Sequence, residues 1–155
     1  MTPPSPDVPP PSTLPLSPPV LPSGVPMIRT IAMPSDTNPA GDIFGGWLMA
    51  QMDLAAGNAA ARRARGRCVT IAVDGMAFLS PVHVGDEVSL YARILSVGRT
   101  SMKILVEAWR RPRHAFDSIQ VTKATFTFVA IDENGRPRPV PEDQPLPDSQ
   151  GCENA

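Results

Sequence analysis

The spacing of apolar residues separates one helical stretch of the chain from several alternating ones. Between Gly45 and about Arg65, apolar residues recur at intervals of three and four, the period of a helix with one buried face. They are Trp47, Leu48, Met52, Ala55, Ala56 and Ala59. We therefore predict one long helix here, made slim by its alanines and ended by Gly66.

Alternating apolar and polar residues predict five strands around this helix. They are expected at Met27–Met33, Cys68–Phe78, Asp86–Val97, Ser101–Arg110 and Val121–Ile131. In the second of them the alternation places Val69, Ile71 and Val73 on one face. Four strands follow one another through short, turn-forming links, which favours an antiparallel sheet. One helix packed on such a sheet gives an α+β fold.

Proline restricts the folded unit to the middle of the chain. Of the 20 prolines, eleven fall within residues 1–26 and five more between Pro137 and Pro147. Repeated proline removes amide donors and fixes φ, so these segments cannot contribute much regular structure. We predict a disordered Pro-rich leader at 1–26, one folded domain at 27–140 and a disordered Pro-rich, acidic tail at 141–155.

Charge is distributed unevenly between these parts. All 14 Lys and Arg lie between Arg29 and Arg138, whereas five of the 15 acidic residues lie in the two tails. A basic, Arg-rich domain suits a small ligand that carries phosphate. Nucleic acid is not expected, because no basic run is interleaved with aromatic residues.

Other features of the sequence indicate where the protein is located and whether it self-associates. No segment is long and apolar enough for a transmembrane helix, and the first residues do not read as a secretory signal peptide. Two cysteines, Cys68 and Cys152, do not make a disulfide framework, so a reducing cytoplasmic location is expected. The chain offers nothing to cover the second face of the sheet, which predicts self-association.

Few residues could carry out catalysis. The sequence has no G-x-S-x-G elbow, no P-loop and no G-x-G-x-x-G motif. His83 and His114 are far apart, and no Cys, His and acidic cluster has the spacing of metal ligands, so no metal site is predicted.

The most informative stretch runs from Asn38 to Trp47. It places Asp42 beside Gly45 and Gly46, at the start of the predicted helix. Unpaired amides at a helix start can hold a developing oxyanion, and a nearby carboxylate can activate water or attack a carbonyl. By themselves these residues fit a helix cap and a tight turn better than a catalytic site.

Other residues offer weaker candidates. Asp53 is a carboxylate on the helix and is the second choice for a catalytic acid. Gln51 or Asn38 could orient water or hold the loop, although local capping is the more ordinary role for Asn38. The aromatic and Met residues near the helix start, Phe44, Trp47, Met49 and Met52, could line an acyl tunnel or simply pack in the core.

Several motifs in order resemble the YciA-type acyl-CoA thioesterases of the hotdog superfamily. They lie at Arg29–Asn38, Gly41–Asp53, Gly75–Asp86 and Gly98–Ser101, and the resemblance fades after Asp132. It covers nearly all of the predicted domain and leaves out both Pro-rich ends. Pro39 departs from the family pattern and stiffens the loop without removing the acid.

The resemblance implies a hotdog fold, in which an antiparallel sheet wraps a central helix. It also implies dimers with active sites between protomers, and assembly of those dimers into hexamers. Asp42 matches the catalytic acid, Gly45 and Gly46 match the helix-start amides, and Asn38 belongs to the same motif. The loop Gly98, Arg99, Thr100 and Ser101 matches the region where CoA is expected, although these residues could equally complete a hairpin turn.

The expected function is therefore hydrolysis of acyl-CoA to a free acid and CoA. No separate cofactor is expected, since CoA is part of the substrate. One alternative is a non-catalytic acyl-CoA-binding regulator on the same fold. Another is a hotdog hydratase or dehydratase, but that activity needs a catalytic His, and neither His83 nor His114 lies near the helix start.

Overall fold

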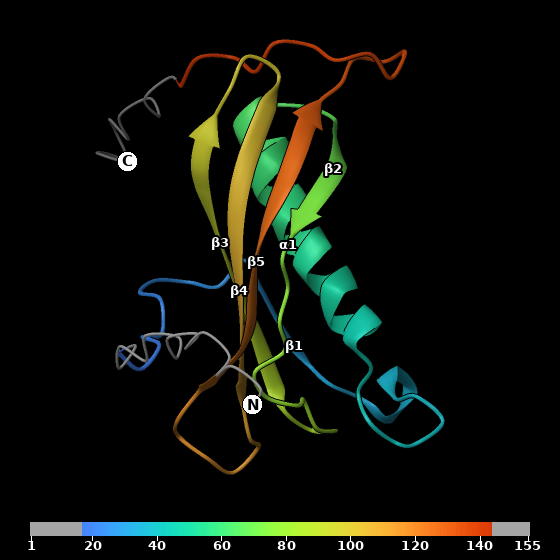
Figure 1. Ribbon diagram of the computed structural model, residues 1–155, viewed down its shortest axis with the longest axis vertical. Coiled ribbons are helices and arrows are strands. Elements are labelled where there is room, and N and C mark those ends of the chain that lie inside the picture. Colours follow the sequence, from blue (N-terminus) through green and yellow to red (C-terminus); the bar gives the residue numbers. More distant parts are fainter. Residues whose placement is uncertain (1–16, 144–155) are drawn as a thin grey trace, which may run out of the picture.

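A computed structural model describes residues 17–143 of the chain, and the ends of the predicted leader and tail lie outside it. One long helix, α1 (Gly45–Ala64), lies across a five-stranded sheet (Figure 1). The strands are β1 (Ile28–Ile31), β2 (Cys68–Asp74), β3 (Glu87–Val97), β4 (Ser101–Arg111) and β5 (Ile119–Ala130), and a short 3-10 helix, η1 (Pro34–Asp36), follows β1. The strand order is β1-β3-β4-β5-β2, and every neighbouring pair is antiparallel. The predicted α+β class is confirmed.

The core lies between α1 and the inner face of the sheet. The buried face of α1 consists mainly of alanines, together with Leu48 and Met52. Opposite it, β4 and β5 contribute alternate residues such as Ile104, Val106 and Phe126. Because alanine side chains are short, the helix backbone comes close to the sheet, and a Cβ placed on Gly57 would lie 3.5 Å from the ring of Phe128. The curved sheet thus wraps the helix.

Three register shifts interrupt the ladders. The extra residues are Ile71 in β2, Leu95 in β3 and Val121 in β5, the last opposite the step from Ala108 to Trp109 in β4. An extra residue on one strand bends that strand and increases its twist. These irregularities help the long central strands to curl around α1.

The strand after the helix is shorter than predicted. It ends at Asp74 and not at Phe78, and residues 75–86 form a loop that returns to the sheet. The prediction that Val69, Ile71 and Val73 share one face is wrong: the register shift at Ile71 sets Val69 opposite Val129 and Val73 opposite Phe126, which point to opposite faces of the sheet, and all three residues are exposed, Ile71 by 59%. Since β2 is at the end of the strand order, its outer edge is unpaired within the described chain.

The helix ends by a different device from the one expected. The residue in the left-handed conformation is Arg65 (φ 52°), and Gly66 follows it with no positive φ. A Cβ at Gly66 would lie 2.6 Å from Arg138 Nη2, so a side chain there would displace the end of this arginine. That same atom donates a hydrogen bond to the carbonyl of Ala64 at 2.9 Å. An arginine from the C-terminal segment therefore caps the helix, and glycine gives it room.

Parts of both predicted tails contact the domain. Pro22, Ser23 and Val25, from the predicted leader, line a cavity together with Tyr91 and Leu105 of the sheet. At the other end of the chain, the N–H of Val140 donates to the carbonyl of Arg99, and Arg63 Nη1 donates to the carbonyl of Pro141 at 2.6 Å. Residues 137–141 are thus fastened at the end of the molecule where α1 terminates.

Candidate active site

The loop that carries Asp42 is built around the side chain of Asn38. Its Oδ1 accepts hydrogen bonds from the N–H groups of Ala40 (3.0 Å) and Asp42 (3.1 Å). The N–H of Asn38 donates to the carbonyl of Asp42 at 2.7 Å, and a bridge between Thr37 and Ile43 closes the loop. Asn38 therefore holds the loop. The structure shows no helix-capping role for it.

The carboxylate of Asp42 is exposed to solvent and has no partner among the described residues. Asp42 is exposed, and its side chain makes no hydrogen bond or ion pair with the residues that the structure describes. The N-cap of α1 is Phe44, two residues later, and no side chain caps the helix start. Asp42 therefore does not act as a cap, which removes the structural role that the sequence alone favoured.

The first turn of α1 presents backbone amides in a confined space. Because no side chain caps it, the N–H groups of Gly45 and Gly46 have no acceptor at the helix start among residues 17–143. A Cβ on Gly45 would lie 3.1 Å from Cζ of Phe78, and one on Gly46 would lie 3.1 Å from Cε2 of Phe44. Glycine at both positions lets the two aromatic rings stand against the helix backbone.

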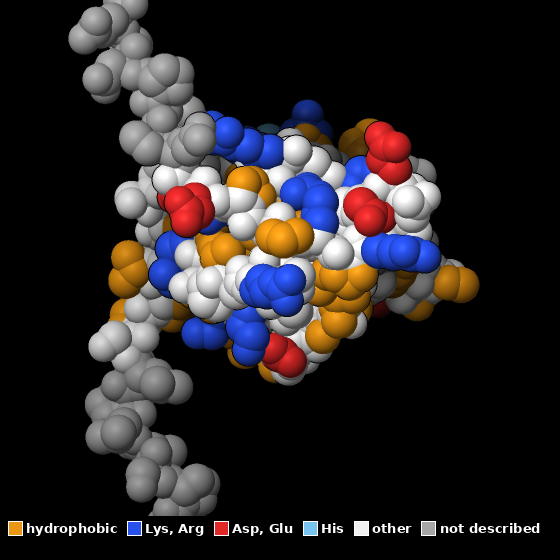
Figure 2. Space-filling view, turned by 90° about the horizontal axis from the view of Figure 1, so that it is seen from above, with side chains coloured by type: hydrophobic (Ala, Val, Ile, Leu, Met, Phe, Trp, Pro, Cys, Tyr) orange, Lys and Arg blue, Asp and Glu red, His pale blue; other side chains and the backbone are white. Residues whose placement is uncertain are grey.

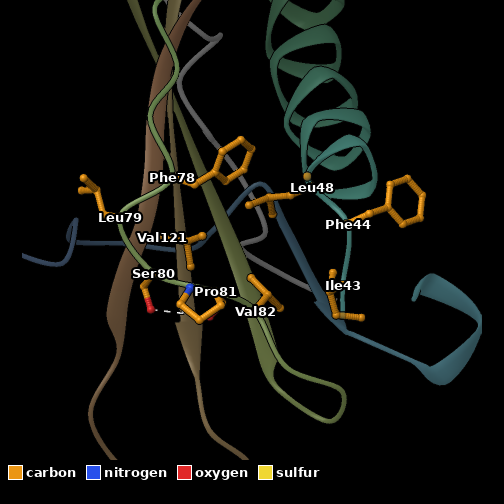
Figure 3. A pocket seen from close by; sticks show the side chains of 10 residues that line it. Ile43, Phe44, Leu48, Phe78, Leu79, Ser80, Pro81, Val82 and Val121 are labelled. Carbon is orange, nitrogen blue, oxygen red and sulfur yellow. Dashed lines mark hydrogen bonds between the residues drawn. The ribbon is translucent and has the colours of Figure 1, made fainter. Parts of the chain in front are cut away.

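A cavity of about 330 Å³ opens beside this helix start. Apart from Ser80 and Gly45, the lining residues have apolar side chains, and they come from the residues directly after Asp42, from α1, from the loop after β2 and from β5. The lining residues are Ile43, Phe44, Gly45, Leu48, Phe78, Leu79, Ser80, Pro81, Val82 and Val121. In Figure 3 the side chains of Phe78 and Leu48 point toward one another between the loop and the helix. The volume and lining suit an apolar chain.

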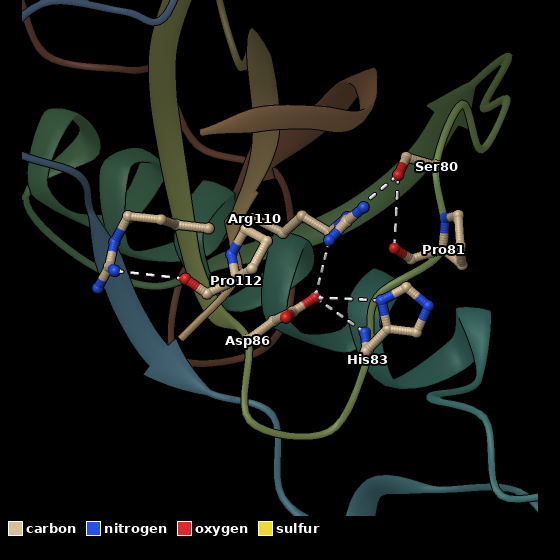
Figure 4. Close-up of polar contacts among 7 residues, drawn as sticks. Ser80, Pro81, His83, Asp86, Arg110 and Pro112 are labelled. Atoms are coloured by element: carbon tan, nitrogen blue, oxygen red, sulfur yellow. Dashed lines mark hydrogen bonds and ion pairs between the residues drawn. The ribbon is translucent and has the colours of Figure 1, made fainter. Parts of the chain in front are cut away.

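A buried polar cluster holds the loop wall of this cavity. Asp86 is only 4% exposed, and its Oδ2 accepts from the N–H of His83 (2.9 Å) and from Arg110 Nη1 (3.3 Å). Arg110 Nε in turn donates to Ser80 Oγ at 3.1 Å (Figure 4). The N–H of Leu79 also donates to the carbonyl of Val121 at 2.7 Å. No functional role was predicted from the sequence for Asp86, Arg110 or Ser80.

The other sequence candidates lie elsewhere or are already bound. Asp53 Oδ1 accepts a hydrogen bond of 2.6 Å from Thr70 Oγ1, which ties α1 to β2. His83 is exposed, with Nδ1 3.7 Å from Asp86 Oδ2, and Gln51 is half-buried with no hydrogen-bond partner among the described residues. Of the aromatic and Met candidates, Phe44 lines the cavity, Met52 is in the core, Trp47 packs on the core and Met49 is exposed.

The predicted CoA loop is not near Asp42 in the same chain. Gly98, Arg99, Thr100 and Ser101 form and flank the turn between β3 and β4, at the end of the molecule where α1 terminates. Asp42 precedes the other end of α1, and a helix of 20 residues is about 30 Å long. One protomer therefore cannot bring the two halves of the predicted site together.

The described residues 17–143 contain neither a cluster of metal ligands nor a helix that could cross a membrane. No group of three or more Cys, His or acidic residues there could hold a metal ion. α1 is the longest helix in this part of the chain, and neither it nor η1 has the length and hydropathy needed to cross a membrane.

Comparison with known proteins agrees with this geometry. Residues 40–115 match the model of the thioesterase superfamily. An uncharacterised acyl-CoA thioester hydrolase of Zymomonas mobilis is 58% identical over 81% of this chain and 84% of its own length. The acyl-CoA thioester hydrolase YciA of Escherichia coli K12 is 48% identical over 78% of this chain and 94% of its own.

Solved structures give the same result. HI0827, a hexameric broad-specificity acyl-coenzyme A thioesterase, superposes with a TM-score of 0.75 at 49% identity, over 80% of this chain and 86% of its own. Cj0915, a hexameric hotdog-fold thioesterase of Campylobacter jejuni, has a TM-score of 0.71 at 40% identity, over 76% and 91% of the two chains. An Asp-to-Ala variant of HI0827 has also been solved.

A single helix wrapped by a curled antiparallel sheet, with an uncapped start beside a free carboxylate, defines a hotdog-fold protein of the thioesterase superfamily. Within that superfamily, the chain belongs to the YciA-type acyl-CoA thioester hydrolases. The family resemblance and the hotdog fold expected from the sequence are confirmed.

Proposed function

We propose that this enzyme hydrolyses acyl-CoA thioesters with Asp42 as its catalytic carboxylate. The observation that carries the proposal is the junction of three features at one helix start. They are an unpartnered carboxylate, uncapped amides at Gly45 and Gly46, and an apolar cavity lined by the next residues of the same loop. A thioester needs a nucleophile, an oxyanion site and a place for its acyl chain, and these features supply all three.

The proposed chemistry begins with the helix-start amides. They polarise the thioester carbonyl, and Asp42 either removes a proton from an attacking water or attacks the carbonyl itself to form a mixed anhydride. In both routes the C–S bond breaks and CoA leaves as a thiolate, whose basicity is low enough that no strong general acid is needed. Water enters the acid product, and no cofactor takes part.

The active site is proposed to be completed between two protomers. The edge of β2 is unpaired, and exposed apolar side chains stand on it and on the adjoining helix: Val69, Ile71, Val73 and Leu54. Antiparallel pairing of two β2 edges would bury these residues. The two-fold axis of such a pair reverses the second protomer, so its β3–β4 turn lies toward the Asp42 end of the first.

This arrangement gives each residue group of the predicted site a role. Asp42, Gly45, Gly46 and the loop held by Asn38 act on the thioester, while Arg99 in the turn Gly98–Ser101 of the second protomer contacts the phosphates of CoA. We propose the dimer as the minimal unit and a trimer of dimers as the assembly. A cytoplasmic location is proposed on the basis of the sequence.

The test is release of CoA from short, medium and long acyl-CoAs, followed with a thiol reagent. Asp42→Asn is expected to lower kcat by about 10²–10⁴, the usual contribution of a general base, with a smaller change in KM. Asp53→Asn is the matched control: the new amide still accepts from Thr70, so turnover is expected to stay near that of the unaltered enzyme.

Two outcomes would contradict the proposal. Wild-type turnover by the Asp42→Asn variant would show that the site is misassigned. An unaltered protein that binds acyl-CoA but releases no CoA from any chain length would be a binding module.

A further inference from the structure

The two ends of the molecule have different surfaces. Figure 2 views the end where α1 terminates and shows Lys and Arg side chains distributed across it. Such a surface suits the phosphates of CoA and not an acyl chain. The acyl chain is therefore expected at the other end of α1, where the cavity lined by Leu48 and Phe78 lies.

The walls of this cavity are of two kinds. Some lining residues belong to the core and are at most 6% exposed: Leu48, Val82 and Val121. Others are large, apolar and between 44% and 65% exposed: Phe44, Phe78 and Leu79. Figure 3 shows Phe44 and Leu79 pointing away from the cavity. Phe78 points instead toward Leu48, between the loop and the helix, so among the lining residues it is the exposed side chain that closes the cavity.

The backbone on both sides of Phe78 is attached to β5. The carbonyl of Ala77 accepts a hydrogen bond of 2.8 Å from Thr122 Oγ1, and Thr122 is fully buried. The N–H of Leu79 donates to the carbonyl of Val121 at 2.7 Å. Since Val121 and Thr122 are consecutive residues of one strand, these two bonds fix the backbone of Phe78 opposite the helix.

The ring of Phe78 contacts α1 at a residue that is proposed to supply an oxyanion amide. A Cβ on Gly45 would lie 3.1 Å from Cζ of Phe78, closer than an ordinary van der Waals contact. The tip of the ring thus lies against the backbone of Gly45. An acyl chain whose carbonyl is bound at this amide enters the cavity alongside the ring, so the ring limits the space that is open to the chain.

We propose that Phe78 determines which lengths of acyl chain the enzyme accepts. This inference rests on the proposed function, since it concerns the acyl group of the same thioester. Each methylene that moves from water to an apolar wall raises kcat/KM about fourfold while the cavity has room. When the chain has filled the space beside the ring, further methylenes stay in water and add little. The ring of Phe78 therefore sets the chain length at which the increase ends.

Phe78 is also the wall residue that can be changed without opening the core. Phe78→Ala removes the whole ring, which leaves room for about four more methylenes. The ring is half-exposed, so its loss removes few core contacts. The same change at Leu48 or Val121 would leave a buried cavity and destabilise the fold.

The test measures release of CoA by the full chain from straight-chain substrates between acetyl-CoA and palmitoyl-CoA. For each variant, kcat/KM for every longer substrate is divided by kcat/KM for butyryl-CoA. In Phe78→Ala this ratio is expected to rise at least tenfold for chains beyond the wild-type plateau, because several more methylenes are buried at about fourfold each. Phe78→Leu, which keeps part of the side chain, is expected to give an intermediate ratio.

Phe44→Ala is the matched control. Phe44 has a ring of similar exposure at the same helix start, where it lies against Gly46, but this ring points away from the cavity. Its removal is expected to change kcat/KM by the same factor for every substrate and so to leave the ratio unchanged. Circular dichroism and light scattering confirm that each variant keeps its fold and its oligomeric size.

Two results would overturn the inference and leave the proposed function intact. They are a wild-type ratio in both Phe78 variants, and an equal rise of the ratio in Phe44→Ala. If Phe78→Ala releases no CoA, the ratio in Phe78→Leu decides by itself: an increase supports the inference, and a wild-type value overturns it. An unaltered protein that releases no CoA from any substrate would contradict the proposed function, and the inference with it.

Discussion

Removal of the carboxylate of Asp86 is expected to be the most damaging single change outside the core. Asp86 is 4% exposed and is the ion-pair partner of Arg110, whose side chain is 11% exposed. In Asp86→Ala, Arg110 becomes a buried cation without a counter-charge, and the N–H of His83 loses its acceptor. Breaking a buried pair in this way costs about 3–5 kcal/mol.

That cost is a large share of the free energy of unfolding, which is about 5–15 kcal/mol for domains of this size. With an m value of about 1.5 kcal/mol per molar urea, a loss of about 4 kcal/mol lowers the midpoint by about 2.5 M. Asp86→Asn keeps an acceptor for both donors and loses only the charge, so its cost is about 1.5–3 kcal/mol. The assay is urea unfolding followed by circular dichroism at one fixed protomer concentration, because self-association adds to apparent stability.

Glu87→Gln provides the matched control. Glu87 is the next residue and pairs with Arg111 at 3.1 Å, but both side chains are partly exposed, so the cost is about 0–1 kcal/mol. If Asp86→Ala lowers the midpoint no more than Glu87→Gln does, Arg110 is not held by a desolvated pair. The loop wall of the cavity would then not be held by this pair either, because Arg110 connects Asp86 to Ser80.

Four further predictions concern assembly and the thiol. Mixed oligomers of Asp42→Asn and Arg99→Gln chains should regain activity that neither variant has, since one shared site per hybrid dimer is intact; no recovery after mixing under dissociating conditions would refute a shared site. Ile71→Asp, on the free edge of β2, should shift the protein to monomers in analytical ultracentrifugation and abolish turnover, whereas Lys103→Asp on the exposed outer face should do neither. Burial raises the pKa of the Cys68 thiol above its ordinary value of 9.0, opposed by Arg138. In a chain whose other cysteine is Ser, Cys68 should therefore react with iodoacetamide more slowly than free cysteine at pH 8.5. The preference for the protonated thiol adds stability that is fully present below pH 9.0, the unfolded pKa, and is lost above it, so thermal melts across that range should show the decline.

Periodicity predicted the elements well because it reflects which faces are apolar. The helix boundaries of Gly45 and about Arg65 agree with the structure to one residue, and the alternation in β3, β4 and β5 identifies their inner faces. Periodicity does not say what an apolar face packs against. Nor does it foresee a bulge: Val69, Ile71 and Val73 were predicted to share one face, but the register shift at Ile71 turns Val69 and Val73 to opposite faces of an exposed edge strand.

The polar cluster was missed for a different reason. Asp86 and Arg110 are 24 residues apart, and only the pairing of β3 with β4, which sets Val88 opposite Arg110, brings them together. Ser80 reaches the same place through the loop 75–86, of which only residues 75–78 and 86 were predicted to belong to strands. Strand register and loop conformation depend on the whole fold, so no local sequence motif predicts such a contact.

Asp42 and the β3–β4 turn lie at opposite ends of α1. The length of this helix therefore sets the distance between them in one protomer, in addition to its part in the core. If each site takes its carboxylate from one protomer and its phosphate contacts from the other, the reach of the bound substrate is measured against the length of the helix. One inserted turn would add about 5.4 Å and move both ends of the site apart in both halves of the dimer at once. Length variation among relatives is therefore expected in the loops and the tails, while α1 keeps its 20 residues.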